Sequence, residues 1–149
     1  MSKLIVKAAC GLLILLVVVG GLAACGEQMA EPDYASQMTE VTAQGMSDGD
    51  YAAFTQYLSP EAKAAINEAD FNTGNQEIKS LIGDYIGKEY WRTKTQDSYT
   101  VVEYTATFSD EPDEVTITVY FEDIDGEMYI AVFGLSSPKL IASLESSGE

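Results

Sequence analysis

The sequence predicts an α+β fold in which N-terminal helices pack on a curved four-stranded antiparallel sheet. Apolar residues recur with the 3.6-residue period of a helix in the first half of the chain. From about residue 90 they alternate with polar residues, as in a half-buried strand. Because the helices come first and the turns between strands are short, we expect the helices to lie across one face of an antiparallel meander.

Four helices are expected, separated by Asp-, Gly- and Pro-containing breaks. Asp50 and Ser59 are favourable N-caps, and Pro32 and Pro60 suit the first turn of a helix. A further break is expected from Asn72 to Asn75. The first helix has Tyr34, Met38, Val41 and Gly45 on its apolar face, and the second has Tyr51, Phe54 and Leu58. The third is a short helix from Ser59 to about Asn67. The fourth has Ile78, Leu81, Ile82 and Tyr85 on its apolar face and ends near Gly87.

Four strands are expected in the second half, where Val, Ile, Thr, Tyr and Phe are abundant. Asp125-Gly126 between the last two strands is typical of a hairpin turn that requires positive φ. The expected ranges are Tyr90 to Thr95, Tyr99 to Ser109, Glu114 to Asp123 and Glu127 to Leu135.

Residues 1–24 have the layout of a signal peptide. Lys3 and Lys7 precede an apolar run, and small residues lead to Cys25. The segment Leu22-Ala23-Ala24-Cys25 resembles the lipobox of prokaryotic lipoproteins, which implies that Cys25 is acylated and becomes the mature N-terminus. The alternative is an uncleaved helical anchor, since the uncharged stretch from Ala8 to Gly26 is long enough to be considered a membrane span.

Either form of anchoring places the domain at the cell membrane on its extracytoplasmic face, because the lysines precede the apolar run. Residues 25–32 form a short tether, 33–140 the domain, and 141–149 a polar tail that is expected to be disordered from Ser143. Cys10 is removed with the leader and Cys25 is acylated, so no disulfide is expected.

The charge balance argues against a nucleic-acid partner. The chain has 24 acidic and 8 basic residues, and loss of Lys3 and Lys7 changes its formal net charge from −16 to −18. Such a surface repels phosphate backbones. Two interpretations of the acidity remain: a docking face for a cationic partner, or, as we prefer, a hydrated surface that maintains solubility.

Several motifs resemble a family of small exported bacterial and archaeal domains of unknown function, of the DUF3887 type. They are Gly49-Asp50-Tyr51, the helix after Ser59-Pro60, Tyr90-Trp91, and the ending from Ile130 to Leu140. The resemblance spans about Asp33 to Leu140. It implies a cystatin-like or NTF2-like cone, in which helices close over a curved sheet, and an accessory module of the kind found in lipoproteins or beside hydrolase domains.

The residue types exclude several chemistries. Without His or a free Cys, the usual acyl-transfer triads, thiol nucleophiles and sites for zinc, copper or iron cannot be assembled. No cofactor is expected. An oxygen-ligated cation such as calcium remains conceivable at Asp123-x-Asp125-Gly126-Glu127, although a hairpin turn is favoured there. The acidic segment from Asp110 to Glu114 is expected to be a solvated loop.

An isomerase-like enzyme of the NTF2-like type would need a buried carboxylate near a Tyr hydroxyl. Glu103 and Glu122 are the mid-strand candidates. The alternation of apolar and polar residues places both side chains on the face of the sheet opposite the apolar ones, so they are expected to face solvent. Arg92 and Lys94 are expected to form a salt bridge with a neighbouring Glu, the alternative being an anion or a partner carboxylate.

The aromatic residues favour a binding module over an enzyme. A cone lined by aromatic rings can hold a small apolar ligand or a peptide segment, and core packing is the competing interpretation of each ring. We therefore expect a non-catalytic, membrane-anchored module, with an NTF2-like enzyme or an acidic structural envelope protein as alternatives. The candidate pocket residues are Tyr85, Trp91, Tyr104, Tyr120 and Phe133.

Overall fold

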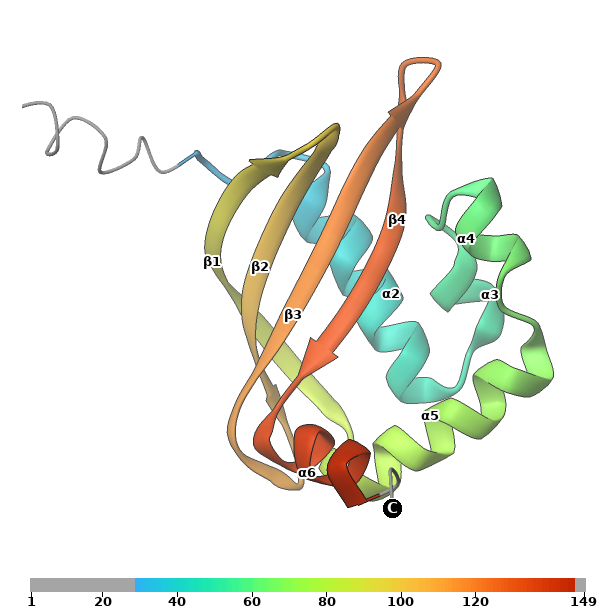
Figure 1. The fold of residues 1–149 in the computed structure, drawn as a ribbon, viewed down its shortest axis with the longest axis vertical. Coiled ribbons are helices and arrows are strands. Elements are labelled where there is room, and N and C mark those ends of the chain that lie inside the picture. Colours follow the sequence, from blue (N-terminus) through green and yellow to red (C-terminus); the bar gives the residue numbers. More distant parts are fainter. Residues whose placement is uncertain (1–28, 147–149) are drawn as a thin grey trace, which may run out of the picture.

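A computed structural model describes residues 29–146, and these residues form helices followed by an antiparallel sheet (Figure 1). Cys25 and the predicted leader lie outside the described residues, so acylation stays a prediction. The elements are α2 (Ala35–Asp48), α3 (Tyr51–Thr55), α4 (Pro60–Ala64), α5 (Glu68–Ile82), β1 (Tyr85–Gln96), β2 (Tyr99–Phe108), β3 (Glu111–Ile124), β4 (Glu127–Ser136) and α6 (Pro138–Ser146). Within residues 29–146, no helix is long and apolar enough to cross a membrane.

The sheet is the predicted meander, with the order β1-β2-β3-β4 and antiparallel neighbours throughout. Its strands curve around α2 (Figure 1). The predicted turn between β3 and β4 is confirmed, since Asp125 and Gly126 have φ values of 56° and 88°. Asp123 stabilises this turn by accepting a 2.8 Å hydrogen bond from the Gly126 amide. The α+β architecture is the one expected of a cystatin-like or NTF2-like fold.

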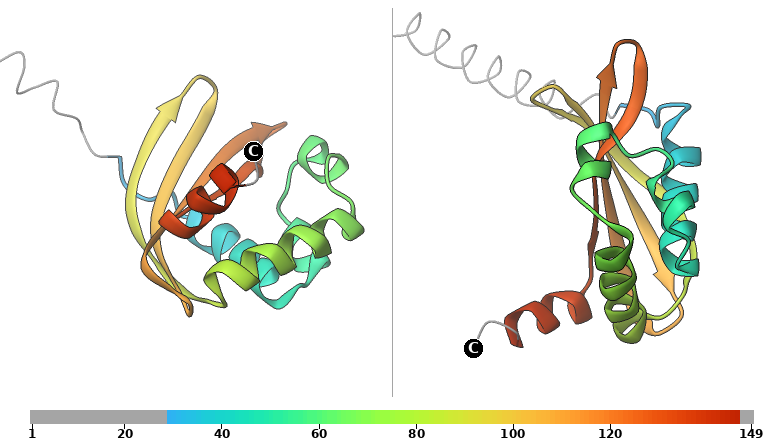
Figure 2. Two further views of the ribbon diagram at one scale, coloured as in Figure 1. Left: turned by 60° about the horizontal axis from the view of Figure 1, so that its bottom comes forward. Right: turned by 90° about the vertical axis from the view of Figure 1, so that its right-hand side faces the viewer.

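The hydrophobic core lies between α2 and the inner face of the sheet. Every second residue of β3 from Val115 to Phe121 contributes to it, because alternate side chains of a strand point to the same face. Its fully buried members include Ala35, Val102, Tyr104, Ile117, Val119, Phe121 and Ile130. Figure 2 shows α6 projecting from the end of the sheet on the side opposite α2.

The short helices begin where the sequence predicts. Asp50 accepts a 3.0 Å hydrogen bond from the Ala53 amide, and Ser59 accepts one of 3.3 Å from the Ala62 amide. At the contact between α2 and α3, Gly45 has no side chain to separate them. A Cβ atom at this position would lie 2.5 Å from the backbone nitrogen of Phe54.

The predicted break from Asn72 to Asn75 is wrong. These residues lie within α5, which begins at the N-cap Asn67 and continues to Ile82. The helix ends at Gly83, whose φ of 81° suits a residue without a Cβ atom. Tyr85, expected at the end of this helix, instead begins β1.

The prediction of a disordered polar tail is also wrong as far as residue 146. Pro138–Ser146 is helix α6, whose apolar residues Leu140, Ile141 and Leu144 have helical spacing. Ser137 caps it, since the Ser137 hydroxyl accepts a 3.3 Å hydrogen bond from the Leu140 amide. The predicted domain boundary at residue 140 therefore falls inside a helix.

Candidate functional site

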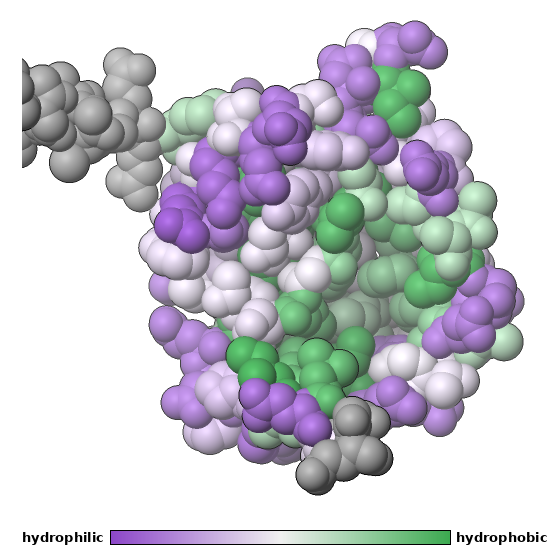
Figure 3. All heavy atoms as spheres, in the orientation of Figure 1, coloured by the Kyte–Doolittle hydropathy of each residue, from purple (hydrophilic) through white to green (hydrophobic). Residues whose placement is uncertain are grey.

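An apolar groove of about 350 Å³ lies between α5, the second half of β4 and α6. Figure 3 shows hydrophobic side chains gathered in a hollow beside β4 and at the lower end of the molecule. This volume lies at the lower end of the range for ligand pockets, which is about 300–1,000 Å³. The groove is lined by Met46, Phe54, Ile66, Asp70, Phe71, Gly74, Asn75, Glu77, Ile78, Leu81, Phe133, Leu135, Leu140, Ser143 and Leu144.

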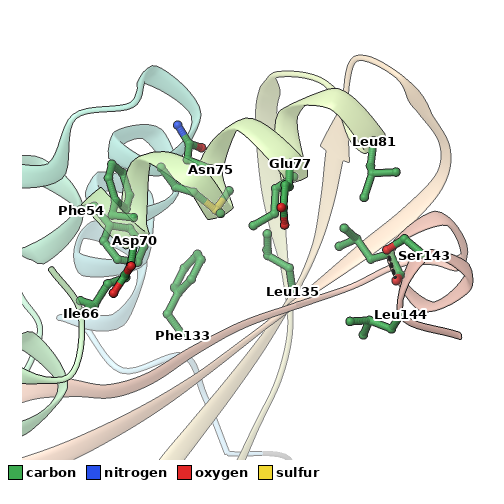
Figure 4. A pocket seen from close by; sticks show the side chains of 15 residues that line it. Phe54, Ile66, Asp70, Asn75, Glu77, Leu81, Phe133, Leu135, Ser143 and Leu144 are labelled. Carbon is green, nitrogen blue, oxygen red and sulfur yellow. Dashed lines mark hydrogen bonds between the residues drawn. The ribbon is translucent and has the colours of Figure 1, made fainter. Parts of the chain in front are cut away.

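The residues that line each wall are spaced according to the period of their helix or strand. On α5, the lining residues Phe71, Gly74, Ile78 and Leu81 are three or four positions apart, so they lie on one helical face. On β4, Phe133 and Leu135 are two positions apart, so they share one face of the strand, and they point toward α5 (Figure 4). The groove is therefore formed where one helical face meets one strand face.

Helix α6 closes the far end of the groove and is secured to the sheet by Glu111. Leu140, Ser143 and Leu144 come from α6, and Leu144 remains 74% exposed. The Glu111 carboxylate accepts a 3.2 Å hydrogen bond from the Lys139 amide in the first turn of α6. Glu111 is buried, so the expectation of a solvated loop is wrong for this residue.

The rim of the groove is acidic. Figure 4 shows the side chains of Asp70 and Glu77 directed from α5 toward the groove. Among residues 29–146, no Lys or Arg lines it. Asp70 accepts a 2.6 Å hydrogen bond from the Asn67 amide group, and neither carboxylate forms an ion pair with a described residue. The site combines an apolar floor with negative charge at its edge.

The five predicted pocket residues do not surround one cavity. Phe133 lines the groove, and its ring lies 6.1 Å from that of Phe54. Tyr85 and Tyr104 are core residues, 6% and 1% exposed. Tyr120 points to the outer face of the sheet, because its neighbours Val119 and Phe121 point into the core.

Trp91 also lies away from the groove. It occupies a β-bulge, since Tyr90 pairs with Tyr104 and Arg92 with Glu103. The Arg92 guanidinium lies over the Trp91 ring, 4.1 Å from its centroid.

A polar cluster joins α2 to β1 and β2 at the edge of the core. Tyr85 donates a 2.8 Å hydrogen bond to Glu40, and Tyr104 donates one of 2.7 Å to Glu31. Burial, followed by the bonded carboxylate, raises the pKa of each tyrosine well above its ordinary value. Lys88, whose side chain is 6% exposed, lies 3.5 Å from Glu40 and stacks over Tyr104.

Glu103 lies on the predicted face, but the expectation that it faces solvent is wrong. The residue as a whole is 6% exposed, because Arg92 and Lys94 reach across from β1 and cover its side chain. Lys94 donates a 2.9 Å hydrogen bond, and Arg92 bonds the other carboxylate oxygen. The predicted salt bridge to a neighbouring Glu is thereby confirmed, whereas Glu122 is half-buried.

Within residues 29–146, no group of His, Cys, Asp or Glu side chains is arranged to hold a metal ion. The segment from Asp123 to Glu127 forms the hairpin turn that was favoured. Sequence reasoning missed most of the groove. The helical spacing of Ile78 and Leu81 indicates the α5 wall, and the four-residue spacing of Leu140 and Leu144 indicates the α6 wall.

Comparison with known proteins identifies the family. Residues 39–133 match the family described as protein of unknown function (DUF3887). No curated protein matches the chain. The match includes α5 and Phe133 but ends before α6, so the α6 wall of the groove lies outside the matched residues. Since the match extends over more than half of the sequence, this chain belongs to the DUF3887 family.

Proposed function

We propose that this protein is a lipid-anchored, extracytoplasmic binding module of the cystatin-like/NTF2-like superfamily, which acts without catalysis by holding an apolar part of its partner in the groove. The groove carries the proposal, because it presents apolar side chains from α2, α3, α5, β4 and α6 and remains open. The lipobox-like segment ending at Cys25 supports anchoring by acyl chains, which needs no contribution from the domain.

The principal alternative is an NTF2-like enzyme, and the Tyr–carboxylate pairs are the observation that favours it. Tyr85 with Glu40 and Tyr104 with Glu31 provide hydroxyls beside carboxylates. None of these four residues lines the groove. The pairs connect α2 and the segment before it to the sheet, a role that accounts for them without a substrate. An acidic structural envelope protein is the third candidate, and its interactions would weaken with salt but survive groove substitutions.

The test is binding of a neutral apolar dye, N-phenyl-1-naphthylamine, followed by its fluorescence. The protein is the chain from residue 25 with Cys25→Ser, which avoids lipid and detergent and keeps every buried core residue of the described segment. Cooperative thermal unfolding verifies that it is folded.

Leu144→Asp places a charge in the groove at a side chain that is 74% exposed, so the fold is preserved. Ile141→Asp is the matched control, because Ile141 lies on the same helix, is 49% exposed and does not line the groove. We expect Leu144→Asp to weaken dye binding about 10-fold and Ile141→Asp to leave it unchanged. Equal effects of the two variants, or no binding by the parent, would contradict the proposal.

A further inference from the structure

The two edges of the sheet differ in how they are protected. The β1 edge is interrupted by two register shifts and by a bridge from Met29 to Thr93. It also carries several charged side chains, namely Lys88, Glu89, Arg92 and Lys94. Bulges and charges of this kind prevent another strand from pairing with an exposed edge.

Among the described residues, those that pair with the β4 edge do so at one point. The Ile130 amide donates a 2.8 Å hydrogen bond to the Tyr57 carbonyl, and the Ile130 carbonyl accepts one of 2.9 Å from the Ser59 amide. Beyond Ile130, no strand or bridge lies on the outer side of β4 within the part of the chain that the structure describes.

This open edge, residues 132–136, has none of the protective features of β1. It pairs with β3 in unbroken register from Val132↔Tyr120 to Ser136↔Thr116. It contains no charged residue and no Pro. A regular, uncharged edge of this length is a template for an additional strand.

The open edge and the apolar groove share two residues. Phe133 and Leu135 belong to the edge and also line the groove. A strand added to β4 would therefore place alternate side chains beside the apolar floor. The rim carboxylates of Asp70 and Glu77 have no ion-pair partner among the described residues, so they complement positive charge on that strand.

We propose that the open β4 edge binds an extended segment of a partner protein as a fifth strand, with alternate apolar side chains in the groove and Lys or Arg side chains beside Asp70 and Glu77. This proposal rests on the proposed function and names its ligand. Main-chain hydrogen bonds to β4 supply affinity, and the groove and its acidic rim supply specificity.

The experiment measures binding of a fluorescein-labelled peptide in which threonine and valine alternate between two terminal lysines. Two further peptides carry N-methyl groups on either the valine or the threonine nitrogens. Since alternate amides of a strand point in opposite directions, only one of these two sets can face β4. We expect one methylated peptide to lose at least about 10-fold in affinity and the other to bind nearly as well as the parent. Equal affinities for all three peptides would overturn strand addition.

The protein variants are Glu77→Lys at the groove and Glu89→Lys on β1, at the opposite edge of the sheet. Both side chains are exposed and both substitutions change the net charge equally. We expect Glu77→Lys to weaken binding about 5- to 10-fold and Glu89→Lys to change it less than 2-fold. Equal weakening would show attraction to the acidic surface as a whole and would overturn the proposal.

Amide hydrogen exchange locates the added strand, because residues 132–136 gain protection only if their edge is paired. Two outcomes separate this inference from the proposed function. Dye binding that depends on Leu144, with no peptide binding, leaves the function standing and overturns strand addition. Absence of dye binding and of peptide binding overturns the proposed function and strand addition together. Sedimentation that shows a dimer in which the same amides are protected without peptide would identify a second copy as the occupant and would also overturn the inference.

Discussion

Lys94 Nζ lies 2.9 Å from Glu103 Oε1, and this ion pair joins the last part of β1 to the middle of β2 on the outer face of the sheet. The Glu103 side chain is only 8% exposed, whereas that of Lys94 is 42% exposed. Burial by itself would raise the pKa of Glu103, but the hydrogen bonds from Arg92 and Lys94 outweigh it and hold the pKa below its ordinary value of 4.5.

Replacing Glu103 by Gln should lower the free energy of unfolding by about 1–3 kcal/mol at pH 7, because a charged hydrogen-bond acceptor is lost. A depressed folded-state pKa stabilises the protein fully above the unfolded-state pKa, and this stabilisation is lost as the pH falls through the folded-state value. Urea unfolding at pH 7 and pH 3 should therefore show a smaller difference between wild type and Glu103→Gln at pH 3. Glu122→Gln is the control, and a difference independent of pH would contradict this account.

Gly74→Ala should stabilise the protein by about 0.5–1 kcal/mol, because Gly is a poor residue in the middle of a helix. A Cβ atom there meets nothing within 4 Å. The measurement is the free energy of unfolding in urea. A loss of stability would mean that residues 72–75 form a turn rather than part of α5.

Gly45→Ala should have the opposite effect. Its Cβ atom would lie 2.5 Å from the Phe54 nitrogen and 2.9 Å from the Ala53 carbonyl carbon, so α3 must move away from α2. Overpacking of this kind costs about 1–3 kcal/mol. The same urea unfolding experiment measures it, and unchanged stability would show that α2 and α3 are not in close contact.

Glu111→Ala should loosen α6, since it removes the carboxylate that bonds the Lys139 amide. Amide exchange in Lys139–Ser143 should accelerate, whereas Glu114→Ala, an exposed neighbour on β3, should leave it unchanged. Burial opposes ionisation of Glu111, but hydrogen bonds from Ser137, Lys139 and Asp113 lower its pKa. The restraint on α6 should accordingly be complete above about pH 4.5 and weaken at lower pH. Equal exchange rates in Glu111→Ala and Glu114→Ala would contradict this role of Glu111.

Cys25→Ala should leave the protein as unprocessed precursor or move it from the membrane fraction, if Cys25 carries the lipid anchor. Cell fractionation and mass spectrometry of the N-terminus measure both effects. Unchanged membrane association and processing in the variant would exclude acylation at this residue. Cys10→Ala is the control and should alter neither.

The periodic parts of the fold were predictable, because side-chain spacing alone determines them. Val115 to Phe121 alternate, and Asp125-Gly126 can form a turn with positive φ, so the meander and its last hairpin followed from the sequence. Asp50 and Ser59 likewise identified two helix starts, since both side chains accept hydrogen bonds from the first turn.

The remaining features depend on contacts between residues far apart in the sequence. The helix-weakening stretch Asn72 to Asn75 stays helical because the residues on either side are held by packing: Phe71 packs against Phe54 of α3, and Ile78 packs against the core. The alternation of apolar and polar residues in β2 predicts the face of the sheet on which Glu103 lies. It does not predict that Glu103 is buried, because the burial results from two cations on the neighbouring strand. The groove was missed for the same reason, since its walls come from α5, β4 and α6.

The most direct test of the groove as the binding site is an amide NMR titration of the folded domain with N-phenyl-1-naphthylamine. We predict that the largest chemical-shift changes fall on Gly74, Phe133 and Leu144, one from each wall of the groove. Changes centred on Trp91 and Tyr120, on the outer face of the sheet, would place binding elsewhere and contradict the account.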